Sequence, residues 1–287
     1  REVLAAALAR PRGPEAALSV RFLVARHGRR ASASEADELW GLLRDDPLAV
    51  GCRGLCDLLY VLTLAKGWSG HRSVGAAIVR AFCEVPHRRE AELLLWPQTL
   101  PLVAEYLTRR AVDPRSTADF LDRVLAPFWG RHPELVAAAL LSHHVLAVAM
   151  ALSRCRGSLS AGNAEVVRST VLLWASASIS RLNARGTAAV ALAISHLGAG
   201  PSGEVVHTAP MAALLRHASS LGQGVQEDGE ERKAPFRPDW LGMLLCALAR
   251  ARCRGSGEEL RLLLAAHLRP AGAPHAPSPL ADPAELQ

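Results

Sequence analysis

Apolar residues recur along most of this chain at the three- and four-residue spacing of a helix that is buried on one face. No stretch shows the sustained alternation of apolar and polar residues that is typical of a half-buried strand. Leu and Ala, which favour helices, supply many of the apolar positions, whereas the 287 residues include 6 Trp, 5 Phe and 2 Tyr. The pattern therefore predicts an all-α fold.

Start and stop signals divide this pattern into separate helices. Ser32 and Glu35 have the spacing of a capping box, and Asp45, Asp46 and Pro47 end the helix that follows. We expect further helices at about residues 15–28, 52–66, 73–84, 88–110, 116–125, 133–154, 163–182, 186–197, 209–221, 239–254 and 257–268. Within these, Pro97 and Pro101 should interrupt residues 88–110, and Ser116 with Asp119 should cap the helix that follows the turn at Asp113 and Pro114.

Three stretches share a Leu- and Ala-rich helix that ends in a basic turn and precedes a second apolar helix: residues 58–67, 145–157 and 241–255. The tetrapeptides Ala-Leu-Ser-Arg (151–154) and Ala-Leu-Ala-Arg (247–250) lie 96 residues apart, and Thr-Leu-Ala-Lys (63–66) lies 88 residues before the first of them. These separations divide into units of roughly 30–35 residues. Helical hairpins of this size bury their apolar faces by stacking, which predicts stacked antiparallel helical hairpins in an α-solenoid-like array. An irregular all-α domain is the alternative.

Composition divides the chain into five parts. We expect a basic N-terminal segment with the first helix (1–34), a helical-repeat array (35–221), an exposed polar loop (222–238), a C-terminal helical hairpin (239–269) and a Pro-rich extended tail (270–287). Residues 1–34 contain seven Arg and two Glu. Such an Arg-rich and acid-poor sequence is typical of an organellar transit segment or of the region that follows its cleavage.

The hairpins at about 55–83, 145–173 and 240–268 resemble the degenerate organellar helical repeats called octotricopeptide and heptatricopeptide repeats. In each, apolar residues lead to a tetrapeptide close to Ala-Leu-Ala-(Arg/Lys), then a short gap and a second Leu-rich helix. The resemblance implies a protein that binds single-stranded RNA in mitochondria or chloroplasts, or that serves as a ribosomal component there. The units are unevenly spaced, these residues hold no separate nuclease-like domain, and no base-reading position can be carried over.

The chain carries 33 Lys and Arg against 27 Asp and Glu, a formal net charge of +6, and 31 of the 33 basic residues are Arg. A GC-rich genome accounts for such an excess without selection, whereas guanidinium groups also suit phosphate. Stacked hairpins would align the clustered arginines as a basic stripe for RNA, although any single arginine near a helix C-terminus also complements the helix dipole. The candidate RNA-binding residues are Arg29, Arg30, Arg88, Arg89, Arg109, Arg110, Arg154, Arg156, Arg250, Arg252 and Arg254.

Few motifs suggest chemistry. Residues 198–203 fit the phosphate-binding pattern G-x-G-x-x-G, which would need a preceding strand at about 188–194; a Gly/Pro turn between helices is the simpler interpretation. Cys52 and Cys56 lie one helical turn apart, and His143 and His144 are adjacent, but neither pair has the spacing of a metal site. Six sparse cysteines favour free thiols in a reducing compartment. We therefore expect no enzymatic activity, metal or cofactor.

The sequence leads to a functional hypothesis with one main alternative, and a helical subunit of a membrane-associated complex ranks third. We expect a non-catalytic helical-repeat component of an organellar ribonucleoprotein, most plainly a mitochondrial ribosome subunit in the organelle matrix that contacts rRNA and neighbouring proteins. The apolar run at 135–152 has Ser142, His143 and His144 at its centre, so a buried helix is expected there and not a membrane span. The alternative is a protein–protein α-solenoid adaptor or scaffold without RNA contact, and neither hypothesis includes a small-molecule substrate.

Overall fold

The computed structural model describes residues 30–84, 89–110, 112–155, 158–197, 208–222 and 237–251, with seven single positions on either side of these ranges (18, 19, 22, 25, 260, 261 and 264). Every regular element in these residues is a helix, which confirms the all-α prediction for them. The α-helices are α3 (Ala33–Leu43), α4 (Gly51–Leu64), α5 (His71–Glu84), α6 (Glu90–Leu95), α7 (Thr99–Arg109), α8 (Pro114–Phe120), α9 (Ala126–Arg131), α10 (Pro133–Ala139), α11 (Ser142–Arg154), α12 (Ala161–Ser178), α13 (Ala184–Leu197), α14 (Thr208–Gly222) and α15 (Pro238–Ala251). A π-helical turn, η1 (Leu121–Leu125), joins α8 to α9, and a 3₁₀ turn, η2 (Ile179–Arg181), follows α12.

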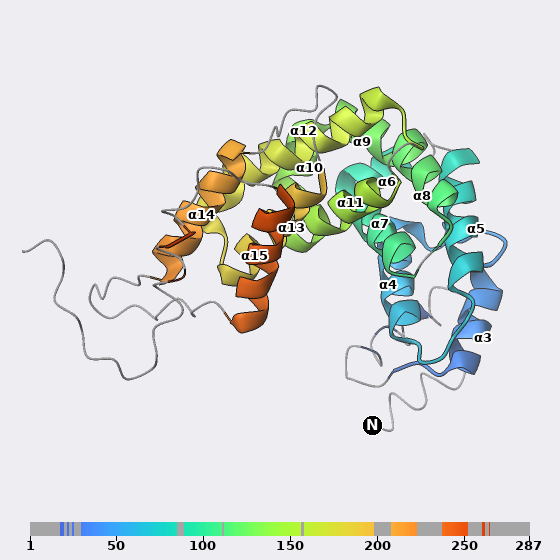
Figure 1. The fold of residues 1–287 in the computed structure, drawn as a ribbon. Coiled ribbons are helices and arrows are strands. Elements are labelled where there is room, and N and C mark those ends of the chain that lie inside the picture. The colour runs from blue at the N-terminus through green and yellow to red at the C-terminus, as the bar shows by residue number, and fades with distance from the viewer. Residues whose placement is uncertain are drawn as a thin grey trace, which may run out of the picture.

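The helices lie in two rows that follow one curved path (Figure 1). We call one of these rows the inner row; it consists of α4, α7, α11, α13 and α15. Each of these helices contacts the neighbouring member of the row: α4 contacts α7, α7 contacts α11, α11 contacts α13, and α13 contacts α15. On the outer side of the curve, α5 contacts α8, α9 contacts α12, and α12 contacts α14. The contacts of α11 with α12 and of α13 with α14 join the two rows.

Two different kinds of packing fill the core. The largest fully buried side chains, including Trp129, Phe82 and Phe120, all come from residues before α10. Phe82 and Phe120 meet edge to face with ring centroids 5.9 Å apart, which joins α5 to α8. By contrast, α13 buries 11 of its 14 residues, and five of those are Ala. Small side chains on α13 allow α11 and α15 to pack closely on either side of it.

The sequence signals place most helix ends correctly. Ser32 and Glu35 form the expected capping box at the start of α3, and Gly67, which has a left-handed φ of 71°, follows the end of α4. Two expectations were wrong in detail. Pro101 does not interrupt the helix, because it lies in the first turn of α7, where a backbone N–H has no intrahelical partner. The cap of α8 is Asp113, whose carboxylate accepts from the N–H of Ser116.

The single helix expected over residues 133–154 is two helices, α10 and α11. Leu140 takes an extended conformation with ψ at 144°, and its carbonyl accepts a hydrogen bond of 3.1 Å from the indole N–H of Trp174 on α12. At the start of α11, the Nδ1 of His144 accepts from the N–H of Leu141. Tertiary contact therefore breaks a segment that is apolar and helix-forming throughout.

Several sequence predictions fall where little is described. The polar loop at 222–238 lies outside the described residues except for positions 222, 237 and 238, and the Pro-rich tail at 270–287 lies wholly outside them. Of the second helix of the C-terminal hairpin, positions 260, 261 and 264 are helical. Among the described helices, none has both the length and the apolar character that crossing a membrane requires.

Candidate binding surface

The C-terminal ends of the inner-row helices lie side by side, and arginines link them. Arg110, just after α7, donates to the carbonyl of Thr63 in the last turn of α4. One helix further on, Arg154 at the end of α11 donates to the carbonyl of Thr108 in the last turn of α7, with Nη1 and O 2.8 Å apart. Carbonyls in the last turn of a helix lack the usual donor four residues further on, so a guanidinium can hydrogen-bond to them and complement the negative end of the helix dipole.

Arg250 continues this edge at the end of α15. Its Nη1 lies 3.0 and 3.1 Å from the two ring nitrogens of His196, in the last turn of α13. The first two links join residues 47 and 46 positions apart in the sequence, and the third joins residues 54 apart. This recurrence is longer than the expected 30–35 residues, because the segments between inner-row helices include short extra helices such as α6 and α10.

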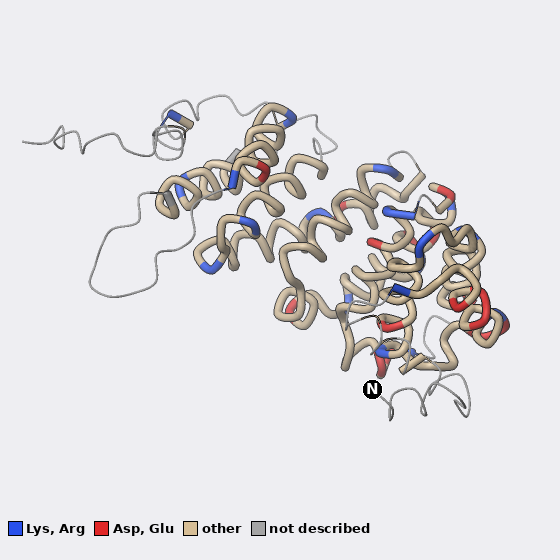
Figure 2. Tube along the Cα trace, turned by 90° about the horizontal axis from the view of Figure 1, so that it is seen from below, with Lys and Arg blue, Asp and Glu red and all other residues tan. Residues whose placement is uncertain are grey.

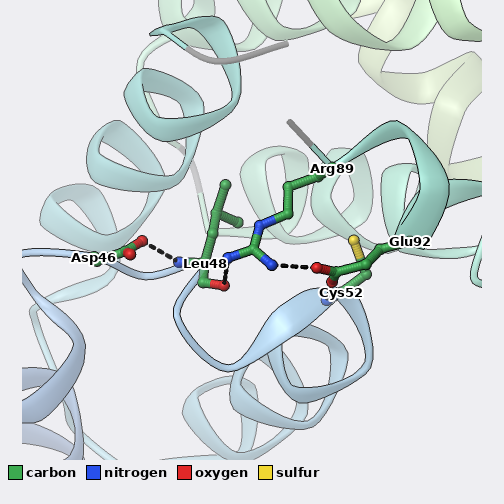
Figure 3. Close-up of polar contacts among 5 residues, drawn as sticks. All are labelled: Asp46, Leu48, Cys52, Arg89 and Glu92. Carbon is green, nitrogen blue, oxygen red and sulfur yellow. Dashed lines mark hydrogen bonds and ion pairs between the residues drawn. The ribbon is translucent and has the colours of Figure 1, made fainter. Parts of the chain in front are cut away.

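Arg89 has a structural partner at the other end of α4 (Figure 3). The side chain of Glu92 on α6 accepts from the N–H of Cys52 at 2.8 Å and so caps the N-terminus of α4 from outside. Arg89 pairs with the other carboxylate oxygen of Glu92 and donates to the carbonyl of Leu48 at 2.7 Å. A Cβ at Gly51, where φ is 70°, would lie 3.0 Å from the Glu92 carboxylate, so glycine suits this close approach.

The remaining arginines predicted to bind RNA are divided between described and undescribed positions. Arg109 is exposed and pairs with Glu105 one turn earlier on α7, at 2.8 Å. Arg30 is exposed just before α3. Arg29, Arg88, Arg156, Arg252 and Arg254 lie outside the described residues. The structure thus brings Arg110, Arg154 and Arg250 to one edge of the inner row, and it places Arg89 away from that edge, at the start of α4.

Charge is distributed unevenly along the described chain. Residues 30–140 contain 13 Lys and Arg and 14 Asp and Glu, whereas residues 141–251 contain 10 Lys and Arg and 7 Asp and Glu. Among the described residues of the second range, seven Arg stand against two acids, Glu165 and Asp239. Figure 2 shows most of the acidic segments on the right, among the N-terminal helices, whereas the helices on the left carry basic segments with little red. The unneutralised positive charge therefore belongs to the second of these regions, which we call the basic half.

Two arginines of the basic half were missed by the sequence prediction. Arg181 in η2 and Arg185 in the first turn of α13 are both exposed, and neither forms an ion pair with a described residue. They do not form an adjacent pair or a triplet, so a search for such clusters passes over them. The sequence did contain a feature that could have identified these two arginines: residues 166–203 contain no Asp or Glu, so the positive charges there have no acidic neighbours in sequence.

A groove of about 620 Å³ lies on the inner row, mostly in the first of the two regions, and it reaches His143 at the start of the second. Its lining includes Tyr60 and Leu64 of α4, Leu102, Glu105 and Arg109 of α7, and His143 of α11. Phe22, one of the single described positions near the N-terminus, also lines it and meets Tyr60 edge to face at 5.6 Å. The groove lining therefore combines apolar and aromatic side chains with charged ones such as Glu105 and Arg109, a mixture that binding sites also show.

The two adjacent histidines of α11 have different surroundings. Burial, followed by the neighbouring His143, lowers the pKa of His144 to about 4, so His144 is a neutral core residue. Burial also lowers the pKa of His143 at the groove, although Glu105 opposes that shift. Both imidazoles are therefore uncharged at neutral pH.

The cysteines that the structure describes are free thiols. Burial, followed by the Glu92 carboxylate, raises the pKa of Cys52 to about 12, so this thiol stays protonated. Burial also raises the pKa of Cys56, whose Sγ donates to the hydroxyl of Thr99. Within the described part of the chain, no three His, Cys, Asp or Glu side chains gather as a metal site.

The glycine-rich turn at 198–203 lies outside the described residues, but the segment before it does not. Residues 188–194 belong to α13, so the strand that a nucleotide-binding turn requires is absent at this place. Comparison with protein-family models, curated proteins and solved structures found no match to this chain. Its function is therefore inferred from its own residues.

Proposed function

We propose that this chain is a non-catalytic helical-repeat component of an organellar ribonucleoprotein, and specifically of a mitochondrial ribosome in the organelle matrix. In this proposal the inner and outer rows are a short α-solenoid. The basic half contacts rRNA, and helix faces elsewhere contact neighbouring proteins. The organellar setting rests on the Arg-rich composition and on the resemblance to octotricopeptide and heptatricopeptide repeats.

The observation that carries the RNA contact is the excess of arginine over acid among the described residues of the basic half, with Arg181 and Arg185 exposed four positions apart in sequence. RNA binding depends on cations that neutralise phosphates and release counterions, and acidic neighbours weaken that effect. Arg185 also lies in the first turn of α13, where the helix dipole favours anions. By contrast, Arg110 and Arg154 already donate to helix carbonyls.

A protein–protein adaptor without RNA contact is the second candidate. The apolar groove on α4 and α7 supports it, as does the use of Arg89, Arg110 and Arg154 within the fold. An adaptor of this kind would bind a partner helix and would show no salt-dependent binding of RNA. The two candidates therefore differ in a quantity that can be measured.

The test is an RNA titration of the full chain and of the double variant Arg181→Glu/Arg185→Glu. The probe is a fluorescent single-stranded RNA of mixed sequence, about 20 nucleotides long, titrated between about 50 and 200 mM KCl. The double variant should bind about tenfold more weakly at low salt, and its slope of log affinity against log salt should be shallower by about 1.4, since each lost contact contributes about 0.7. Glu at position 185 suits the first turn of a helix, so α13 should remain folded.

The matched control is Arg72→Glu/Arg80→Glu, which reverses two exposed charges on α5 in the other region. This variant should bind RNA within about twofold of the wild type. Equal losses from both double variants would point to nonspecific charge, and a wild-type chain with no salt-dependent RNA binding would favour the adaptor.

A further inference from the structure

We propose that Ser32 is a phosphorylation site for a basophilic serine/threonine protein kinase, and that Arg30 and Lys66 bind the phosphoryl group once it is attached. Ser32 is the N-cap residue of α3, which lies at one end of the curved path of helices (Figure 1). This inference goes beyond the proposed function and does not depend on RNA binding.

The residues before Ser32 match the pattern that basophilic kinases recognise. Arg29 and Arg30 lie three and two positions before the serine, in the sequence Arg-Arg-Ala-Ser. Such kinases bind the two guanidinium groups with carboxylates beside the substrate cleft, so the charge pattern around a hydroxyl decides which serine reacts. The other two Arg-Arg pairs of the chain, at 88–89 and 109–110, are followed two positions later by Ala and Val. Ser32 is therefore the one hydroxyl of the sequence that has this pattern.

The Ser32 hydroxyl is exposed and weakly engaged. Its Oγ accepts from the N–H of Glu35 at 3.2 Å, and its own proton has no acceptor among the described residues. The backbone at Ser32 is extended, with φ at −72° and ψ at 166°, which suits the extended form in which kinases bind a substrate segment. Ser160, the N-cap of α12, differs because its hydroxyl donates to the Asp122 carboxylate at 2.8 Å. A phosphoryl group on Ser160 would lie against that carboxylate.

The contacts that hold Ser32 in place are local. Glu35 accepts from the N–H of Ser32 at 2.8 Å, and the carbonyl of Ala31 accepts from the N–H of Lys66 at 3.3 Å. Between the buried Ala31 and Ala36, the side chains are exposed or partly exposed. Opening of the Ala31 contact and of the first turn therefore gives a kinase access to Ser32 while the rest of α3 stays packed.

Two cations line the same groove as the Ser32 hydroxyl. This groove of about 770 Å³, which we call the α3 groove, is lined by residues 30–35 and by the turn after α4, which includes Lys66. Arg30 and Lys66 are both exposed, and neither forms an ion pair with a described residue. A phosphoryl group on Ser32 would lie among these cations and at the positive end of the α3 dipole, and the Glu35 carboxylate would oppose it. The two cations outnumber that carboxylate, so the α3 groove favours the phosphorylated form.

The reaction is a phosphoryl transfer from ATP. The Ser32 Oγ forms a new bond to the γ-phosphorus, the bond between that phosphorus and the β,γ-bridging oxygen breaks, and ADP leaves. The hydroxyl proton passes to the catalytic Asp of the kinase. The product carries about 1.5 to 2 additional negative charges at neutral pH, and its acceptor oxygens suit Arg30 and Lys66.

The experiment treats the full chain with the catalytic subunit of a basophilic kinase and γ-labelled ATP, and it maps the label by mass spectrometry of phosphopeptides. The wild-type chain should incorporate about one phosphoryl group, on Ser32. Ser32→Asn should lower incorporation at least about tenfold, and α3 should remain folded because Asn is also a favoured N-cap residue. Ser34→Ala is the matched control, since Ser34 is exposed in the same turn without the Arg pair, and it should stay within about twofold of the wild type.

Two further variants test the cations. Arg30→Gln should lower the kinase kcat/KM for the chain about tenfold, because one recognised guanidinium group is lost, whereas Arg80→Gln on α5 should stay within about twofold of the wild type. In the phosphorylated chain, Lys66→Gln should raise the second pKa of the phosphate, because a nearby cation stabilises the dianion. Phosphorus NMR measures that pKa, and Arg80→Gln should leave it unchanged.

Each readout has a result that overturns part of the proposal. A folded chain without label on Ser32, under conditions in which the kinase labels a control peptide, would exclude the phosphorylation site. So would label that is spread equally over Ser32 and Ser34. If Ser32 is labelled but Lys66→Gln leaves the phosphate pKa unchanged, the α3 groove does not bind the phosphoryl group. None of these measurements involves RNA, so the proposed function stands or fails separately.

Discussion

Residues 30–140 and residues 141–251 differ both in what fills their cores and in the charge that they carry. The first region buries Trp129, Phe120 and Phe128, whereas the second is built around α13, where five of the 11 buried residues are Ala. The first region has 13 bases and 14 acids, and the second has 10 bases and 7 acids, of which seven Arg and two acids are described. The two differences are connected through the roles of the carboxylates.

In the first region, carboxylates hold elements together. Asp37 accepts from the indole N–H of Trp68 at 2.6 Å, Glu92 caps α4, and Glu90 pairs with Arg131 at 3.0 Å. In the second region, the described helices pack closely through small side chains, and few carboxylates link one element to another. A consequence is that Arg181 and Arg185 keep their charge available for an external anion, whereas Arg168 and Arg237 pair with Glu165 and Asp239. The groove on α4 and α7 suits a polypeptide.

The largest expected effect comes from removing an aromatic side chain from the first region. Phe120→Ala should lower the free energy of unfolding by about 3–5 kcal/mol, because it leaves a cavity against Phe82. Urea unfolding followed by circular dichroism measures it. Leu173→Ala, at a position on α12 that is 53 % exposed, should change stability by less than about 0.5 kcal/mol. A similar loss from both variants would contradict the account of the two cores.

The complementary change in the second region is to enlarge a buried alanine. Ala191→Leu should destabilise the fold by about 1–3 kcal/mol, since α13 has no space for added methylene groups between α11 and α15. The same substitution at the exposed Ala177 of α12 is the control and should be nearly neutral. Should Ala191→Leu prove stabilising, the packing around α13 would be looser than the close contact inferred for it.

The Glu92 carboxylate that caps α4 should make a smaller contribution to stability, and that contribution should depend on pH. Burial alone would raise the pKa of Glu92, but hydrogen bonds from the Cys52 N–H and from Arg89 outweigh it and hold the pKa below its ordinary value of 4.5. Its contribution to stability is therefore present above pH 4.5 and is lost as the pH falls through the folded pKa. Glu92→Gln should cost about 1 kcal/mol at pH 7, and the difference from the wild type should vanish in acid. If the difference in stability between Glu92→Gln and the wild type did not change with pH, the contribution of Glu92 would come from packing and not from its charge.

The smallest expected effect is at the C-terminal edge of the inner row. Arg154→Met should lower stability by about 0.5 kcal/mol through loss of the contact with the Thr108 carbonyl. RNA affinity should stay within about twofold of the wild type, because this guanidinium is already engaged. If Arg154→Met weakens RNA binding as much as Arg181→Glu/Arg185→Glu does, the edge is itself part of the RNA contact.

Most helices could be predicted from the sequence, because the periodic spacing of Leu and Ala and capping residues such as Ser32 reflect local conformational preferences. What sequence reasoning missed depends on neighbours in space. The break at Leu140 follows from the hydrogen bond to Trp174, and the roles of Arg110 and Arg154 follow from which carbonyls lie next to them. Arg181 and Arg185 were passed over because adjacency in sequence was used as the sign of a basic stripe, whereas the absence of nearby acids was the better sign.

The central claim is that RNA contacts belong to residues 141–251 and not to residues 30–140. The most direct measurement is ultraviolet cross-linking of the endogenous protein, purified under native conditions, followed by mass spectrometric mapping of the cross-linked peptides. The account predicts that rRNA copurifies and that cross-links concentrate on peptides containing Arg181 and Arg185. Cross-links confined to α4 and α7, or a native complex that contains no RNA, would contradict it.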